Sequence, residues 1–532
     1  MEYSSLGIDF GTSNTLLAGW DEQTQSVSLI PIPAYSRMVS KGTDEVPLIP
    51  SLIHYSPDGR IWIGQQVHEQ ASAASRRTLR WMKQYIISRS PFRIQLDDHN
   101  ITPAQAARDF LNAIFTSLIA ESEIRPDKIA FSAPVESFED YNNWLNTLAE
   151  TNRLNNIVLI DEPVAAAVGY GLSIQPGNVF LIFDFGGGTL HAAVVIIQSE
   201  SPLGSKPLCR VLGKAGKNIG GMRIDQWLYQ EMLKRFNLTE DHPAVRQSSN
   251  QILSACERLK ESLSVNERDS TGDLQLGNGT IINLDLTRDE FEAILNKNHL
   301  FTEIDQLLRS VLNQAQEKGY GEEQIQSVLL IGGSSLIPSV QDHLKNYFGS
   351  RRVELNRPLD AVARGAALFA SGAGVLDHIR HDYAIRYVDP STRRYAFHKI
   401  VPSGTPYPTI EPIARLTIKA SHNGQQKLGL SIFEIQNHQQ SGFLQENLEL
   451  IFDPQGCARI IELPARQVQE RAYFYVNEHS PTFLTANPPA QADVPRFEVA
   501  FHIDSRKRLT ITARDLQTGI IIIEDQPVIR LA

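Results

Sequence analysis

One turn that occurs twice constrains this chain more than any other feature of its sequence. An apolar run leads into Asp9-Phe10-Gly11, and a second apolar run leads into Asp184-Phe185-Gly186. A third run ends in the pair Gly332-Gly333. Glycines in such turns let backbone N–H groups form a nest around an anion. A single turn of this kind is explained as well by ordinary hairpin glycines, but the repetition favours a duplicated fold that holds phosphate twice.

The aspartates indicate what accompanies the phosphate. Two carboxylates beside bare phosphate would be repelled, whereas Mg²⁺ between them would favour both. Asp9 and Asp184 are therefore the predicted metal ligands. Hydroxyl donors follow in Thr12, Ser13 and Thr189. The chain does not carry a P-loop, and no G-x-G-x-x-G follows a strand.

The first two thirds of the chain alternate helical and strand-like patterns. Three helical stripes are visible: Ala107, Phe110, Leu111, Ile114 and Leu118 after a start at Thr102-Pro103; Ile224, Leu228, Met232 and Phe236; and Ile304, Leu307, Leu308, Val311 and Ala315 before Gly319. Apolar runs at 157–160, 179–183 and 328–331 have the length of buried strands. This alternation predicts an α/β architecture.

After about residue 370 the period changes to two, which is typical of strands with one buried face. Phe497, Val499, Phe501 and Ile503 alternate with polar or small residues, and Ser505-Arg506-Lys507 is a candidate turn before the next strand. Asn423-Gly424 predicts a tight hairpin. We expect residues 383–532 to form a mostly antiparallel β domain, with a Gln/Asn-rich loop near 436–445.

Composition excludes several classes of function. The net charge is −10, which disfavours nucleic-acid binding because neutralising phosphates needs a basic surplus. The three cysteines, Cys209, Cys256 and Cys457, have neither metal-ligand nor disulfide spacing. The sequence shows no membrane-length apolar run and no signal peptide at Met1–Ser5. We expect a cytoplasmic protein without nucleic-acid or membrane partners.

Further motifs lie at 160–167, 220–221, 256–264, 332–338 and 356–367. With these segments and the first two turns in family order over residues 6–370, the chain resembles the heat shock protein 70 (DnaK-type chaperone) family of the actin-like ATPase superfamily. The resemblance implies an actin-like, ribonuclease-H-like duplicated nucleotide-binding domain at 1–370 with two lobes. A linker at 371–382 and an all-β sandwich at 383–532 without a helical lid would follow. ATP or ADP with Mg²⁺ would bind the first domain, and unfolded or extended polypeptide segments the second, with co-chaperones as further partners.

The resemblance also assigns roles to residues. The expected catalytic residues are Asp9, Glu162, Asp184, Thr189 and His68. The expected nucleotide-binding residues are Gly11, Thr12, Ser13, Asn14, Gly186, Gly187, Gly188, Gly220, Gly221, Glu257, Lys260, Ser264, Gly332, Gly333 and Ser334.

Departures from the family pattern lie close to the expected chemistry. The local match places His68 where the family has a catalytic lysine, and an ordinary histidine pKa of about 6.5 leaves it mostly neutral at pH 7. Lys83 is a candidate replacement cation, and a shift of the match by one residue would make His68 an ordinary surface residue. His191 replaces an aspartate, and it is equally well explained as a packed strand histidine. Glu261 and Leu336 replace two arginines that sandwich adenine, which leaves the base preference open.

Three functions remain in competition. The leading one is a lidless DnaK-like chaperone that binds polypeptide under nucleotide control and hydrolyses ATP slowly. The second is a nucleotide-binding sensor or scaffold with little or no ATPase activity. A small-molecule kinase of the same superfamily is third, and the β domain disfavours it.

Overall fold

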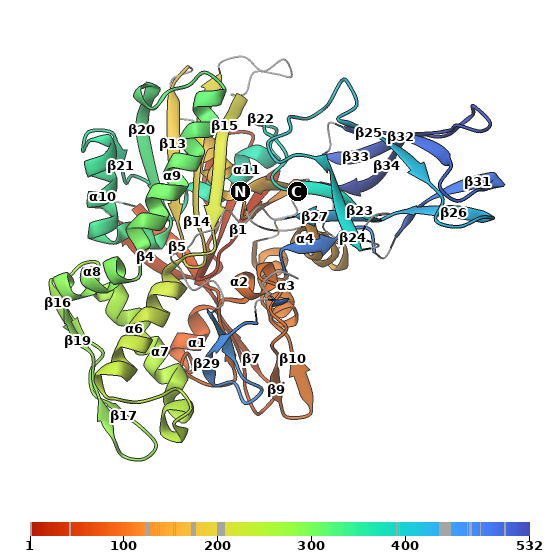
Figure 1. Ribbon diagram of the computed structural model, residues 1–532. Helices are drawn as coiled ribbons and strands as arrows, with labels where there is room; N and C mark the ends of the chain where they lie inside the picture. The colour runs from red at the N-terminus through yellow and green to blue at the C-terminus, as the bar shows by residue number, and fades with distance from the viewer. Residues whose placement is uncertain are drawn as a thin grey trace. The chain divides into compact units, whose positions relative to one another are not determined.

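A computed structural model gives the arrangement of the chain (Figure 1). It describes residues 3–41, 44–122, 128–135, 137, 139–152, 154, 156–171, 177–198, 208–389, 392, 394–435, 448–464, 466–467, 471–478, 480–504 and 507–531. The chain divides into two compact units. Unit 1 comprises Met1–Val135, Leu145–Leu376 and Ser441–Leu463, and unit 2 comprises Glu136–Trp144, Asp377–Gln440 and Pro464–Ala532.

Two sheets form the centre of unit 1, and they follow one plan. The first has the order β12-β11-β1-β2-β5-β4, with β3 also paired to β2: β12 (Ile157–Asp161), β11 (Lys128–Ala133), β1 (Ser5–Phe10), β2 (Asn14–Asp21), β5 (Asp44–Pro50), β4 (Arg37–Lys41) and β3 (Ser26–Leu29). The second has the order β21 (Val353–Glu354), β20 (Ile325–Ile331), β13 (Val179–Phe185), β14 (Leu190–Gln198), β15 (Leu208–Lys217) and β22 (Gly374–Leu376).

The strands that carry the repeated turn occupy equivalent places in the two sheets. β1 pairs antiparallel with β2 and parallel with β11, while β13 pairs antiparallel with β14 and parallel with β20. Asp9 lies opposite Leu16 and Asp184 lies opposite His191. The duplication expected from the repeated turn is therefore present in the strand pairing.

Two helices made largely of small residues, α5 (Glu162–Gly171) and α11 (Ala361–Ala370), pack against each other at very close range. A Cβ atom added to Gly365 would lie 1.6 Å from the Ala165 carbonyl oxygen, and one added to Gly169 would lie 2.2 Å from that of Ala361. Such distances exclude any side chain at either glycine. Glu162, the first residue of α5, directly follows Asp161, the last residue of β12.

Helices cover the two sheets. In the first sheet α3 (Pro103–Ser122) packs Phe110 against Phe10 and Phe115 against Phe131, with ring centroids 6.0 and 6.3 Å apart. In the second, α9 (Leu300–Glu317) packs on β14 and β15. The expected helical stripes are confirmed in α3, α6 and α9, apart from Phe236, which follows α6 and is partly exposed. The chain also forms η1 (Glu322–Gln324), η2 (Gly333–Leu336) and α10 (Pro338–Phe348) in unit 1, and α4 (Glu139–Thr151), of which Glu139–Trp144 belongs to unit 2.

Two arms extend from the sheets of unit 1 (Figure 1). We call residues 53–101 the first arm: β6 (Ile53–Tyr55), β7 (Ile61–Ile63), α1 (Gln65–Glu69), β8 (Thr78–Leu79), α2 (Met82–Ile87), β9 (Ile94–Leu96) and β10 (His99–Ile101). We call residues 221–297 the second arm: α6 (Gly221–Arg235), α7 (Pro243–Leu263), β16 (Arg268–Ser270), β17 (Leu274–Gln275), β18 (Ile281–Ile282), β19 (Asp285–Thr287) and α8 (Arg288–Lys297).

Unit 2 is rich in antiparallel strands, as the period-two pattern predicts. One sheet has the order β24 (Tyr395–Val401), β23 (Asp382–Val388), β27 (Ile432–Ile435) and β30 (Tyr473–Tyr475), and another has the order β25 (Ala414–Lys419), β32 (Pro495–Ile503), β33 (Arg508–Asp515) and β34 (Ile521–Arg530). A further pair joins β26 (Gln425–Leu430) to β31 (Thr482–Ala490). Buried side chains of all three sheets, including Tyr383, Leu428 and Phe501, form one apolar cluster.

Two details differ from the expectations for residues 383–532. β28 (Leu448–Phe452) and β29 (Ala458–Glu462) form a hairpin that belongs to unit 1, whereas the period of the sequence gave no reason to separate it from the β domain. The chain does turn at Asn423-Gly424, where Gly424 has φ +81°, but the tight hairpin is wrong. β25 pairs with β32 and β26 pairs with β31, because the apolar faces of these strands are buried there.

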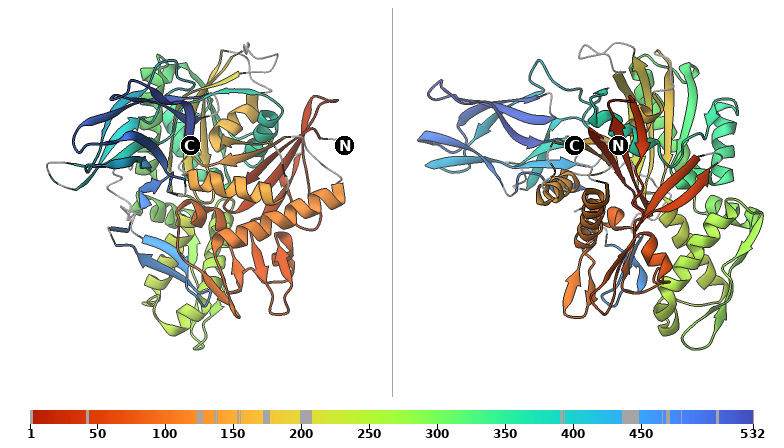
Figure 2. Two further views of the ribbon diagram at one scale, coloured as in Figure 1. Left: turned by 90° about the vertical axis from the view of Figure 1, so that its right-hand side faces the viewer. Right: turned by 180° about the vertical axis from the view of Figure 1, so that it is seen from behind.

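The Gln/Asn-rich segment 436–445 and the turn residues Ser505 and Arg506 lie outside the described residues. Around the latter, β32 and β33 pair as neighbours, with Ile503 opposite Leu509. In the part of the chain that the structure describes, no helix combines the length and hydrophobicity that crossing a membrane requires. Two further views show the same elements (Figure 2).

Candidate functional site

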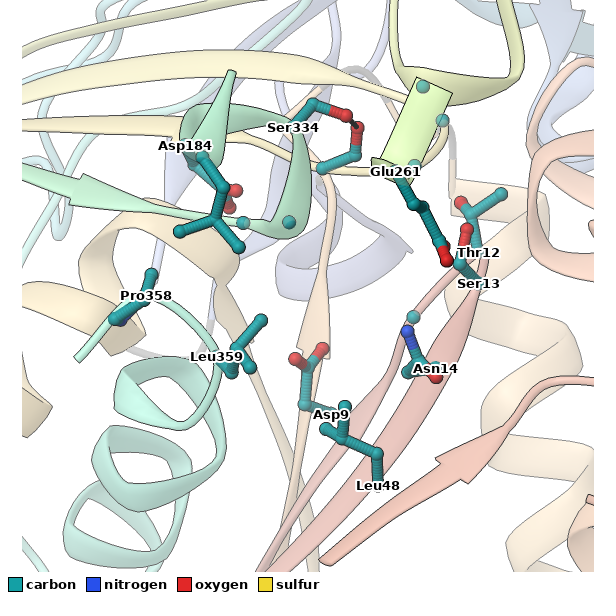
Figure 3. Close-up of a pocket in the computed structure, with 18 of the residues that line it drawn as sticks. Asp9, Thr12, Ser13, Asn14, Leu48, Asp184, Glu261, Ser334, Pro358 and Leu359 are labelled. Carbon is teal, nitrogen blue, oxygen red and sulfur yellow. Dashed lines mark hydrogen bonds between the residues drawn. The ribbon is translucent and has the colours of Figure 1, made fainter. Parts of the chain in front are cut away.

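All three glycine turns border one cavity of about 500 Å³ in unit 1. Figure 3 shows Asp9, Thr12, Ser13, Asp184, Glu261 and Ser334 around it. The walls come from both sheets and from both arms. The cavity is large enough for a small-molecule ligand of nucleotide size.

The first two turns approach each other closely, so a side chain at either of two glycines of the second turn would displace a hydroxyl group of the first. A Cβ atom added to Gly187 would lie 2.3 Å from Ser13 Oγ, and one added to Gly188 would lie 2.5 Å from Thr12 Oγ1. Gly220 does not line the cavity, but its added Cβ atom would lie 2.5 Å from the backbone of Gly187. The amides of Gly221 and Met222 donate to the carbonyls of Gly186 and Gly187 at 3.0 and 2.8 Å. The start of α6 thus fixes the second turn in place.

Asp9 and Asp184, the two expected metal ligands, both line this cavity. Burial raises the pKa of Asp9 to about 6, although Lys83 and a hydrogen bond from Ser132 Oγ, at 2.7 Å, act in the opposite direction. Burial and the nearby Glu162 carboxylate raise the pKa of Asp184 to about 7. Ionising either carboxyl group without a nearby cation therefore costs free energy. A bound metal ion would lower this cost, because its positive charge stabilises the carboxylates.

Glu162 lies between a lysine and a histidine. Its carboxylate forms an ion pair with Lys83 Nζ, and its Oε2 atom is 3.3 Å from His191 Nδ1. Burial alone would raise the pKa of Glu162, but Lys83 and His191 outweigh that effect and lower it to about 2. Glu162 is thus an anion at neutral pH, and it is paired with the buried ammonium group of Lys83.

The donor atoms present fit a divalent cation. One ligand atom each from Glu162, Asp184 and His191 lies within 4.8 Å of the other two. The set combines two carboxylates with an imidazole, whereas Mg²⁺ prefers oxygen ligands and retained waters. Asp9 is not part of this three-residue group but lines the same cavity.

The opposite end of the cavity is formed by α7 and the third glycine turn. Glu257, Lys260, Glu261 and Ser264 contribute from α7 and its C-terminal cap, and Gly332, Gly333, Ser334 and Leu336 contribute from the turn. Lys260 Nζ is 2.8 Å from Asp225 Oδ1, and Ser334 Oγ donates to the Gly186 carbonyl at 2.9 Å. This end combines charged groups with the apolar side chains of Leu336 and Ile337.

The structure brings together every sequence-predicted site residue except Gly220 and His68. His68 lines a neighbouring cavity of about 280 Å³ together with Arg80, Trp81 and Arg258. Burial and nearby Arg37 lower the pKa of His68, so it carries no charge there at neutral pH. Among the cationic side chains that line the main cavity, Lys83, on α2, is the one that forms an ion pair with Glu162. His68 therefore lies outside the main cavity, and its catalytic role stays a prediction.

Sequence reasoning missed several wall residues. Arg37, on β4, borders both cavities, and its surroundings in the sequence contain no motif. An apolar wall also comes from Val39, Leu48, Leu359 and Val362. Their only signal is ordinary strand or helix hydrophobicity, which does not separate a pocket wall from a core.

The fold and cavity define a duplicated α/β protein with a glycine-lined site and a second, β-rich unit. The sequence model of a family described as "Hsp70 protein" matches residues 148–436, more than half of the 532 residues. The chain belongs to the Hsp70 family.

Two curated relatives are similar over most of their length. A protein named "Chaperone protein DnaK" from Thermotoga petrophila is 24% identical, with 97% of this chain and 78% of the relative aligned. A "Chaperone protein HscA homolog" from Cupriavidus taiwanensis is also 24% identical, covering 97% of this chain and 77% of the relative.

Proposed function

We propose that this chain is an ATP-binding chaperone of the Hsp70 family, in which nucleotide bound to unit 1 regulates the hold of unit 2 on unfolded or extended polypeptide. One observation carries the proposal most directly: Asp9 and Asp184, which end equivalent strands of two duplicated sheets, line one cavity with all three glycine turns. The names of the relatives, both chaperones, support it. The actin-like domain and the β-sandwich are part of the same proposal.

The phosphates of ATP or ADP would lie against the first two turns. The hydroxyl groups of Thr12, Ser13 and Thr189 are donors at that end of the cavity. The nucleoside would lie between α7 and the Gly332–Leu336 turn, which supply polar and apolar contacts from two sides. Glu261 replaces a stacking cation in this end of the site, so we expect weaker selectivity for adenine than a guanidinium sandwich would give.

Asp9 and Asp184 would hold Mg²⁺, with Glu162 beside them. When bound, the ion would neutralise phosphate charge. Lys83 would place its ammonium group near the terminal phosphate, while Glu162 fixes the lysine position through their ion pair. Glu162, which stays ionised, would also orient a water molecule for attack. The protein groups thus position the reactants and balance charge.

Hydrolysis is expected to be slow because His191 takes the place of a carboxylate. Its ring is fully buried and lies against Glu162, so it adds no negative charge for metal or water. This observation also favours the second candidate, a nucleotide-binding sensor or scaffold with little or no ATPase activity. Peptide binding by unit 2 and the action of co-chaperones are expected in the first case.

Calorimetry with ATP and ADP in the presence of Mg²⁺ tests binding, and single-turnover measurement of phosphate release tests hydrolysis. Binding with measurable turnover supports the chaperone ATPase. Binding without turnover supports the sensor. No heat with any adenine or guanine nucleotide would contradict both. Fluorescence anisotropy of a labelled apolar peptide, with and without nucleotide, tests unit 2.

A further inference from the structure

The β28–β29 hairpin stands apart from the rest of the C-terminal sequence. The chain leaves unit 2 after Gln440, and residues 441–463 belong to unit 1 before the chain returns to unit 2 at Pro464. The two strands pair from Leu448 opposite Glu462 to Phe452 opposite Ala458. In Figure 1 its label, β29, lies between those of α7 and β7.

One side of the hairpin contacts the first arm. Phe452 is 1% exposed, and its ring centroid lies 6.3 Å from that of Trp81, 6.3 Å from Tyr85 and 6.0 Å from Phe92. Tyr85 Oη donates to the Leu450 carbonyl at 2.8 Å. These contacts combine an aromatic cluster with a buried hydrogen bond, so they are specific as well as apolar.

The turn of the hairpin also fits the first arm. The amide of Gln95, on β9, donates to the Pro454 carbonyl at 2.8 Å. Gly456 has φ +75°, and a Cβ atom there would lie 2.0 Å from the Arg76 carbonyl oxygen. Glycine is required on both counts, because the backbone is left-handed and the space is filled.

The opposite side of the hairpin contacts the second arm through polar groups. Asn250, on α7, donates from Nδ2 to the Gly456 carbonyl at 2.9 Å, and its Oδ1 accepts from the Ala458 amide at 3.0 Å. The Ala458 amide is also 2.9 Å from Ser249 Oγ. Both the nitrogen and the oxygen of the Asn250 side-chain amide therefore form hydrogen bonds with the hairpin backbone.

Charged pairs extend this second contact. Arg246 Nη2 is 2.9 Å from Asp453 Oδ2, and Arg459 Nη2 is 2.5 Å from Asp241 Oδ1. The Ile460 amide donates to Glu240 Oε2 at 2.8 Å. The hairpin is thus bonded to both arms along its length.

The position of the hairpin is important because both arms also contribute side chains to the wall of the main cavity. Lys83 enters it from the first arm, whereas Glu257 and Lys260 enter it from the second.

Direct hydrogen bonds also join the arms. Arg80 is 3.1 Å from Glu257 and donates to Ser254 Oγ at 2.8 Å. Arg76 Nη2 donates to the Gln247 carbonyl at 3.2 Å, and Asn250 Nδ2 donates to the Ser75 carbonyl at 3.3 Å. The hairpin adds its contacts with both arms to these bonds. A ligand enclosed between the arms leaves most readily when they separate, and the hairpin opposes that separation.

We propose that the hairpin Leu448–Glu462 is an intramolecular clamp that holds the two arms together and slows the release of bound nucleotide. The inference rests on the proposed nucleotide binding for its ligand, but the holding of the arms is a property of the protein alone. According to this proposal, the hairpin lets the chain retain nucleotide without a separate partner protein.

Replacement of residues 448–462 by a Gly/Ser segment of equal length tests the clamp. We expect a fluorescent ADP analogue, chased with excess unlabelled ADP, to dissociate about tenfold faster or more. Circular dichroism checks that the variant is folded. An unchanged dissociation rate in a folded, nucleotide-binding variant would overturn the clamp.

Two single substitutions test the clamp without replacing the hairpin, so they disturb folding less. Tyr85→Phe removes the hydroxyl that bonds Leu450, and it leaves the direct hydrogen bonds between the arms described above in place. Asn250→Ala removes the bonds to the hairpin backbone together with the bond to the Ser75 carbonyl of the first arm. Each is expected to speed release about two- to fivefold. The matched controls are Tyr55→Phe, whose hydroxyl bonds Asp109 in unit 1 instead, and Gln251→Ala at an exposed position of α7. Equal release rates for test and control variants would contradict the proposal.

A measurement without nucleotide separates this proposal from the proposed function. The three native cysteines are buried, so dyes can be attached at Asp98→Cys in the first arm and Asn278→Cys in the second, both at exposed positions. Energy transfer should fall when the hairpin is replaced, because the arms then move apart. Unchanged transfer would overturn the clamp. Failure of the parent chain to bind any nucleotide would overturn the proposed function instead, and energy transfer would still decide whether the hairpin holds the arms.

Discussion

The turns that follow Asp9 and Asp184 have the same local sequence and the same place in their sheets, yet their surroundings differ. Asp9 accepts a hydrogen bond from Ser132 and faces Leu16 across its hairpin. Asp184 faces His191 and lies beside Glu162. The comparison teaches that a duplicated backbone supplied two similar turns, while side chains from other elements gave the two aspartates different surroundings, with a histidine facing Asp184 alone.

The largest expected effect concerns the lysine that lies between these halves. Lys83→Met removes the buried cation, and we expect turnover to fall about 100-fold or more, by analogy with loss of one preorganised electrostatic group. Glu162 would also lose its partner, so the variant should unfold at lower temperature. Single-turnover kinetics and thermal melting measure the two effects. A variant with parental turnover would remove Lys83 from the mechanism.

Substituting each aspartate in turn compares the halves directly. We expect Asp184→Asn to lower Mg²⁺-dependent turnover at least tenfold, with a smaller change in nucleotide affinity. Asp9→Asn should have a weaker effect, because Asp9 is not part of the Glu162–Asp184–His191 group. Turnover as a function of Mg²⁺ concentration is the measurement. Equal losses would show that the two turns contribute alike.

His191→Asp would place a further carboxylate opposite Asp184. A carboxylate in place of the imidazole should lower the Mg²⁺ concentration needed for half-maximal turnover severalfold, since hard cations prefer oxygen ligands. His191→Asn is the matched control, because it adds no charge. If both variants lowered the Mg²⁺ concentration needed for half-maximal turnover, the cause would be a relief of packing and not a new metal ligand.

The raised pKa values predict a pH effect in metal-free protein. A carboxyl group whose pKa is higher in the folded than in the unfolded state favours folding below its ordinary pKa, and this contribution is lost as pH rises through about 6 to 7. The Asp184→Asn variant should therefore gain free energy of unfolding relative to the parent protein. This gain should be about 1–3 kcal/mol larger at pH 8 than at pH 5. Denaturant unfolding in a chelator measures it. A larger gain at pH 5 would contradict the sign.

The smallest expected effect is that of His68→Ala. His68 lies in the neighbouring cavity and carries no charge at neutral pH, so turnover should change less than about twofold. Together with Lys83→Met, this variant tests which residue supplies the cation. A large loss of activity in His68→Ala would return the histidine to the catalytic set.

The sequence by itself determined the features that depend on local backbone and periodicity. Glycine leaves the space in which Gly187 and Gly188 approach the Ser13 and Thr12 side chains, and the glycine-rich turns are visible as a motif. The buried helical stripe of α3 and the alternation in β32 are likewise local consequences of one apolar face. The same logic placed Asp9 and Asp184 at the ends of equivalent strands.

Only the tertiary structure decided the features that depend on contacts between distant residues. His68 and Lys83 are near each other in sequence, and no local pattern shows which one reaches Glu162 on α5. The expectation of a β domain over residues 383–532 covers β28 and β29 but does not reveal that Phe452 packs against Trp81 and Tyr85. Period and propensity describe which face of an element is apolar, whereas the partner of that face is chosen by the packing of the whole chain.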